Sequence, residues 1–214
     1  LFATLYRPPE GATQGAPSLK VTALPVAPLV MAALIWALYN AALAMVFSFG
    51  PALLIERGLP TAAAGSMTSV FMFVFAVAVP FGGVLADKTG RRDLIIAASR
   101  LSFVLLIPLA MVVPPAAVMA VFAAVGVGFA LAAGPIMTLP ASVLPPEVRT
   151  FGMGVFFTIY YGVMMIAPPI GGAVSEAMGT VAAAFWFGVV LALACVALLL
   201  VFRRWAKPAR VTAG

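Results

Sequence analysis

The chain has 214 residues and a net charge of +6 at pH 7, yet only 8% of its residues are charged and 64% are hydrophobic. Because soluble domains carry about 25% charged residues, this composition excludes a globular fold in water. The sequence holds no histidine and one cysteine, Cys195, which excludes histidine-based catalysis, histidine or multi-cysteine metal sites and internal disulfides. It also lacks the GxxxxGKS/T loop that binds ATP in primary pumps. We therefore expect neither an enzyme nor a metal or cofactor site.

Long uncharged runs predict transmembrane helices, since about 20 apolar residues cross a bilayer. The longest run, residues 101–146, is long enough for two crossings, and its natural break is Val113-Pro114-Pro115 because proline disfavours helix at and before its own position. The runs are continuous and lack the period-2 alternation of a β-barrel. The predicted fold is an all-α membrane bundle over residues 25–204, with spans at 27–49, 62–86, 94–113, 116–141, 151–175 and 181–202.

The basic residues give this topology an orientation. With six spans both termini lie on one side, and of the 12 lysine and arginine residues only Arg57 falls on the other side. Such a bias obeys the positive-inside rule, so we expect both termini to face the cytoplasm and the chain to lie in the cell (cytoplasmic or inner) membrane. Because these residues are dispersed among loops, they indicate a lipid bilayer as partner and not a nucleic acid.

The two ends of the chain lie outside the bundle. Residues 1–7 resemble the tail of another membrane helix and are followed by a linker rich in proline and glycine, so we expect residues 1–24 to be the end of a preceding helix plus a cytoplasmic linker. Residues 205–214 are expected to form a cytoplasmic tail. The alternative is that a few apolar residues at a terminus carry no meaning.

A charged decapeptide, residues 83–92, lies between the second and third spans. Its sequence GVLADKTGRR resembles the GxLaDrxGrr loop of the major facilitator superfamily, in the position where that family carries it. The matching residues are Gly83, Leu85, Asp87, Lys88, Gly90, Arg91 and Arg92. The resemblance implies a transporter built from two six-helix halves, and the start of the chain makes this one look like the carboxy-terminal half, with the amino-terminal half as its partner. It also implies that the loop acts as a conformational latch.

The residue types of this decapeptide suit a tight cytoplasmic reversal between two helices. Gly83 has no side chain and allows a neighbouring helix to approach, whereas Gly90 can take the positive φ that a short reversal requires. Lys88, Arg91 and Arg92 suit the lipid headgroup level. Asp87 is expected to pair with a nearby arginine or with exposed N–H groups at a helix N-terminus. The alternative is an ordinary basic loop in which Asp87 has no role.

A second charged loop, residues 145–150, lies on the same predicted face. Glu147 and Arg149 are candidate latch partners for Asp87. The alternative, equally weighted, is that Glu147 favours the N-terminus of the fifth helix and Arg149 only sets topology.

Polar residues inside the spans are candidates for contact with a solute, because polar groups at membrane depth usually face the bundle interior or a cavity. They fall into two groups, Trp36, Tyr39 and Asn40 in the first span and Tyr160, Tyr161 and Met164 in the fifth. Aromatic rings with one amide suit a modest-sized organic solute. Each of these side chains could instead bond a neighbouring helix, and for any single one we favour packing.

Arg100 is the one basic residue within a span, about 12 Å from Arg92 by helical rise. It could attract an anionic solute, but we favour snorkelling to the headgroups or a structural pair. In the fourth span, Gly126, Ala130 and Gly134 offer a smooth face to another helix, and Pro135 predicts a kink. Pro168 and Pro169 predict a local weakening of the fifth span.

The expected function is alternating-access transport of a small solute as half of a secondary transporter. The alternatives are a facilitative uniporter or pore and a self-pairing half-size carrier, both without ion coupling. No carboxylate lies at mid-span, so proton coupling would need an acidic group from the other half.

Overall fold

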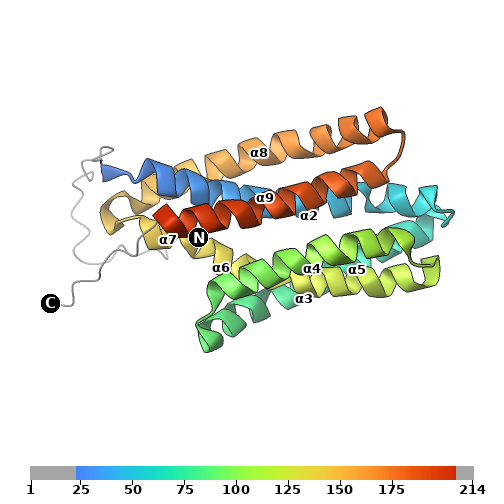
Figure 1. Cartoon of the computed structure of the whole chain (residues 1–214), viewed down its shortest axis with the longest axis horizontal. Coiled ribbons are helices and arrows are strands. Elements are labelled where there is room, and N and C mark those ends of the chain that lie inside the picture. The colour runs from blue at the N-terminus through green and yellow to red at the C-terminus, as the bar shows by residue number, and fades with distance from the viewer. Residues whose placement is uncertain (1–22, 206–214) are drawn as a thin grey trace, which may run out of the picture.

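The fold is a bundle of six long apolar helices, and the computed structural model describes residues 23–205 of the chain (Figure 1). Five spans are single helices, α2 (Val26–Glu56), α3 (Thr61–Thr89), α4 (Arg92–Val112), α8 (Arg149–Met178) and α9 (Ala182–Trp205). The fourth span is divided into α5 (Pro115–Ala130), α6 (Ala133–Met137) and α7 (Leu139–Val143), and a short 3₁₀ turn, η2 (Pro146–Val148), follows it. The predicted all-α membrane bundle with six spans is thus confirmed. The expected linker falls almost entirely outside the described residues, as does most of the expected tail.

The helices pack in two groups of three. Figure 1 shows α2, α8 and α9 along one side of the bundle and α3, α4 and α5 along the other. Contacts between α2 and α3 and between α4 and α9 join the two groups. Helix α2 lies deepest: 67% of the residues in its apolar 18-residue stretch are buried, compared with 17% in the fifth span. The first span is therefore the axis of the bundle, and the fifth lies at its edge.

The fourth span breaks where the sequence places two prolines. Residues 131 and 132 form a turn between α5 and α6, and Thr138 separates α6 from α7. Pro135 and Pro140 have no N–H to donate to the carbonyls four residues earlier, those of Leu131 and Ile136, so the helical ladder is interrupted at both places. The disturbance predicted at Pro135 appears as a short turn at residues 131 and 132, whose backbone stays in the right-handed helical region.

Glycines let α3 lie directly against the broken span. A Cβ added at Gly82 would lie only 2.3 Å from the carbonyl oxygen of Leu131, and one at Gly134 would lie 3.0 Å from the Cα of Gly83. A Cβ at Gly126 would lie 3.0 Å from the carbonyl oxygen of Phe71. A neighbouring helix therefore does approach α3 closely, as expected, but Gly82 is the position where a side chain would clash with it most severely. Gly83 itself has open space where its Cβ would be.

Prolines elsewhere do not interrupt their helices. Helix α8 runs from Arg149 to Met178 through Pro168 and Pro169, so the predicted weakening does not appear as a break. Helices α2, α3 and α4 likewise continue through Pro51, Pro80 and Pro108. Transmembrane helices tolerate proline where neighbouring groups or local adjustments satisfy the freed backbone.

Charged side chains bond to helix ends at the face of the bundle that carries Glu56 and Arg57. Arg57 donates to the carbonyls of Ala110 (2.6 Å) and Val113, which occupy the C-terminal end of α4. The carboxylate of Glu56 accepts the backbone N–H of Val181, just before α9. These bonds satisfy groups that a helix end would otherwise leave unpaired. The single basic residue at this end of the bundle therefore has a structural use.

Candidate functional site

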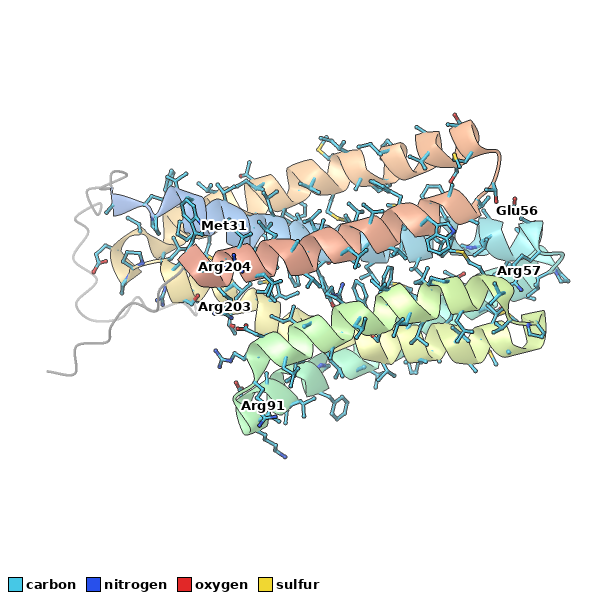
Figure 2. All side chains as sticks on the ribbon, viewed as in Figure 1. Met31, Glu56, Arg57, Arg91, Arg203 and Arg204 are labelled. Atoms are coloured by element: carbon cyan, nitrogen blue, oxygen red, sulfur yellow. The ribbon has the colours of Figure 1, made fainter. Side chains whose placement is uncertain are left out.

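The two ends of the bundle differ in charge. Figure 2 places Arg91, Arg203 and Arg204 at one end and Glu56 with Arg57 at the opposite end. At the basic end Arg203 forms an ion pair with Asp93, which ties the last turn of α9 to the first turn of α4. The structure thus gathers the loop basic residues at one face, as the positive-inside argument requires.

The motif loop forms a tight reversal at this basic end. Gly90 closes α3 with φ +65° and donates its N–H to the carbonyl of Ala86 (2.9 Å), which confirms the expected left-handed residue. Asp87 accepts a hydrogen bond from Arg92 Nη2 at 3.0 Å. Both side chains of this pair are exposed, with 72% of Asp87 and 48% of Arg92 open to the surroundings. The pair is therefore accessible to a competing partner.

The second charged loop contributes no bond to this pair. Within residues 23–205, Asp87 bonds only to Arg92, and neither Glu147 nor Arg149 forms a side-chain hydrogen bond or ion pair. Glu147 lies in η2, and Arg149 opens α8. Their role as latch partners stays a prediction.

The polar residues of the first and fifth spans meet in one aromatic cluster, because α2 and α8 pack side by side. The rings of Trp36 and Tyr39 stack at 5.3 Å between centroids, and Trp36 lies 6.1 Å from Tyr160. Tyr160 lies 4.7 Å from Tyr161, whose side chain is 60% exposed. The cluster therefore runs from the buried axis of the bundle to its surface.

Members of this cluster differ in what they offer a solute. Asn40 is half-buried, and its side-chain N–H donates to the carbonyl of Trp36 in the same helix (2.8 Å). This bond does not use the amide oxygen of Asn40, which can still accept a hydrogen bond. Met164 is half-buried and packs on a small core that contains Met45. Tyr39 is only 1% exposed and belongs to the packed interior. Tyr161 is the exposed member of the cluster, and Trp36, Asn40 and Tyr160 are half-buried.

Arg100 does not snorkel to the headgroups; of the two favoured expectations, its contacts correspond to structural pairing within the bundle. Its side chain is fully buried, with 0% exposure, between α2, α4 and α5. The guanidinium carbon lies 4.4 Å from the ring centroid of Tyr39 and 3.7 Å from that of Phe129. Helical rise gives the depth of a residue but not the direction in which it faces, and Arg100 faces the bundle interior. The cation is held by two aromatic faces.

The carbonyl of Phe129 is the focus of this buried site. It accepts hydrogen bonds from Tyr39 Oη (3.1 Å), Ser99 Oγ (3.0 Å) and Arg100 Nη2 (3.3 Å). Phe129 lies in the last turn of α5, and its carbonyl also accepts a long backbone hydrogen bond from the N–H of Ala132 (3.4 Å). The C-terminal end of a helix also carries partial negative charge, which favours a cation there. The buried arginine and the broken helix therefore stabilise each other.

Comparison with known proteins agrees with the motif and the bundle. The family model described as "Major Facilitator Superfamily" matches residues 21–213. The chain belongs to this superfamily. A relative from Corynebacterium glutamicum, the "Ectoine/proline transporter ProP", is 30% identical over 137 residues. The match covers 62% of this chain and 27% of the relative, so this chain corresponds to a part of that transporter.

Membership in the superfamily, together with six long apolar helices, makes the chain a multi-pass membrane protein. The sequence predicted the motif loop and the individual residues of the aromatic cluster, but not that the residues of the two spans meet. Ser99, Arg100 and Phe129 were not recognised as one site, because their meeting depends on the rotation of α4 and the position of the break. The one available signal was a pair of adjacent polar residues, Ser99 and Arg100, in a span whose further polar side chain is Ser102.

Proposed function

We propose that this chain is the carboxy-terminal half of a secondary transporter, which moves a small organic solute across the cytoplasmic membrane by alternating access. An amino-terminal six-helix half, in the same polypeptide, completes the central cavity. Both termini and the basic end face the cytoplasm. The single observation that carries the proposal is the motif loop, in which an exposed ion pair between Asp87 in α3 and Arg92 in α4 bridges the left-handed turn at Gly90.

The latch works through exchange of partners. Asp87 and Arg92 are held near one another but remain exposed, so groups on the other half can replace either partner when the cytoplasmic ends close. Exposed ion pairs contribute at most about 1 kcal/mol, which makes such an exchange easy. Glu147 and Arg149, in the neighbouring loop, are further candidates for these contacts.

The solute contacts the exposed side of the aromatic cluster. Trp36, Tyr160 and Tyr161 offer ring faces, Asn40 offers a hydrogen bond, and Met164 offers an adaptable apolar contact. Tyr39 supports Trp36 from behind. The Corynebacterium relative is named for ectoine and proline, both small zwitterions, and they are the first solutes to test.

Facilitative transport without a coupling ion is the second candidate. The acidic residues in the described part of the chain all lie at helix ends or in η2, namely Glu56, Asp87, Asp93, Glu147 and Glu176. A proton-coupled carrier needs a titratable group inside the spans, and this half supplies no carboxylate there. Coupling therefore depends on the amino-terminal half, and equal uptake with and without a proton gradient would favour the facilitative alternative.

Replacement of Asp87 by asparagine tests the latch. In the complete transporter reconstituted in liposomes, Asp87→Asn is expected to lower the rate of solute uptake severalfold, because the amide loses its charge-assisted bond to arginine. The amount of protein inserted in the membrane is expected to stay the same, since the pair is exposed. Initial uptake rates per inserted protein measure the effect.

Asp93→Asn is the matched control for this change. It removes a carboxylate from the same end of the bundle and breaks the ion pair with Arg203, but it lies outside the motif. We expect uptake close to that of the unmodified transporter. An unchanged rate in Asp87→Asn, or an equal loss in both variants, would remove the latch role.

A further inference from the structure

The guanidinium of Arg100 is fully buried and only partly hydrogen-bonded. Nη2 donates to Ser99 Oγ (2.9 Å) and to the carbonyl of Phe129, but Nε and Nη1 are buried and have no acceptor among residues 23–205. Buried arginine usually pairs with a carboxylate, because an isolated charge is costly in an apolar medium. Here the described carboxylates all lie at the ends of the bundle, remote from this site along their helices.

Nothing outside the half can touch the guanidinium in this conformation, since its exposure is 0%. A carboxylate from the partner half would have to displace the rings of Tyr39 or Phe129 to reach it. The carbonyl and the end of α5 supply partial negative charge, but they do not cancel a full positive one. Arg100 therefore leaves a net positive potential in this part of the spans.

That potential reaches the aromatic cluster through two adjacent rings. Tyr39 lies 4.4 Å from the guanidinium, and Trp36 stacks on Tyr39 at 5.3 Å. Trp36 is half-buried and forms part of the exposed surface proposed to contact solute. Between these groups lie aromatic side chains instead of water, so the field is weakly screened.

We propose that Arg100 is a specificity-determining residue, whose uncompensated buried charge makes the solute site select small solutes that carry a carboxylate. The inference rests on the proposed transport function and names its substrate class. The solute does not touch Arg100. A carboxylate placed against Trp36 would lie on the order of 10 Å from the guanidinium. There, an effective dielectric constant of about 20 favours a solute with the carboxylate over one without it by roughly tenfold in affinity.

Two variants of Ser99 test the charge without removing the arginine. Ser99→Asp places a carboxylate beside Arg100 Nη2 and neutralises it, whereas Ser99→Asn has the same size and no charge. Both lose the hydroxyl bond to Phe129, so structural effects are matched. In the complete transporter in liposomes, we expect the KM for proline to be roughly twofold higher in Ser99→Asp than in Ser99→Asn, because the ammonium group of the zwitterion opposes the attraction of its carboxylate. The preference for proline over its alcohol analogue prolinol should be about tenfold lower in Ser99→Asp, with Vmax for proline similar in the two.

The competitor prolinol, which has a hydroxymethyl group in place of the carboxylate of proline, separates selectivity from general damage. Inhibition of uptake by prolinol is expected to be no weaker in Ser99→Asp than in Ser99→Asn. Arg100→Met gives an independent measurement, and the preference for proline over prolinol should fall about tenfold there too. Equal proline-to-prolinol preference in Ser99→Asp and Ser99→Asn, or an unchanged preference in Arg100→Met, would overturn the inference.

The unmodified transporter distinguishes this failure from that of the proposed function. If it takes up solutes but prefers those without an acidic group, transport stands and the role of Arg100 is wrong. If it takes up no solute from a panel of carboxylate-bearing and neutral compounds, both proposals are contradicted.

Discussion

Replacing Gly82 by alanine is expected to destabilise the bundle by about 1–3 kcal/mol, the usual cost of forcing extra atoms into a packed interior. The added Cβ would lie 2.3 Å from the carbonyl oxygen and 2.7 Å from the Cα of Leu131. These are backbone atoms at the break in the fourth span, so they cannot rotate away as a flexible side chain would. We therefore expect α3 and the fourth span to separate locally, with a lower midpoint of thermal unfolding in detergent.

The neighbouring glycine is a matched control. A Cβ at Gly83 would meet nothing within 4 Å, although Gly83 follows Gly82 directly and belongs to the motif loop. Gly83→Ala is therefore expected to leave the unfolding midpoint unchanged or to raise it slightly, since alanine favours helix over glycine. Equal destabilisation by the two substitutions would contradict the close approach of α3 to Leu131.

Truncation of Phe129 is expected to have the other large effect. Its ring is fully buried and lies 4.5 Å from Tyr39 and 5.0 Å from Phe103, with Arg100 over its face. Lipid is as apolar as the core, so the transfer part of the cost is small in a membrane. The cavity part remains, and about 24 cal/mol per Å³ over a ring-sized hole gives about 2–3 kcal/mol for Phe129→Ala. Loss of the cation–π contact adds to this cost.

Phe73→Ala controls for the removal of a phenyl ring. Phe73 lies in α3 and is 70% exposed, so its ring leaves no internal cavity. The free energy of unfolding, measured by titration of detergent-solubilised protein with SDS, should change little in this variant. A comparable loss in Phe73→Ala would indicate that the effect reports ring removal in general and not the packing around Arg100.

The spans were predictable because their signal is local. Helix formation in lipid depends on the length of an apolar run and on proline, and both can be read directly from the chain. Each predicted span lies within or close to an observed one, and the break near Pro135 follows from a missing N–H. The continuity of α8 through Pro168 and Pro169 was not predictable in this way, because neighbouring helices and backbone adjustments decide whether a proline interrupts a helix.

The buried site needed information that no local pattern contains. Arg100 lies at the depth expected from its distance to Arg92, but its rotation about the axis of α4 places it inside the bundle. The acceptor that holds it is a backbone carbonyl, that of Phe129, and a backbone group has no signature in sequence. Likewise the motif identifies Gly83 in the sequence. The stricter steric requirement for glycine at Gly82 depends on the position of Leu131, which only the structure gives.

Access to Tyr161 from the two sides of the membrane tests the central claim most directly. The side chain is 60% exposed in the proposed cavity wall, and Cys195, the single cysteine of this chain, is fully buried. Tyr161→Cys in the complete transporter, with any cysteine of the other half replaced, therefore gives one reactive thiol. Alternating access predicts that membrane-impermeant thiol reagents label it from either side, and that saturating solute slows the labelling. Labelling from one side only, under every solute and gradient condition, would contradict alternating access at this site.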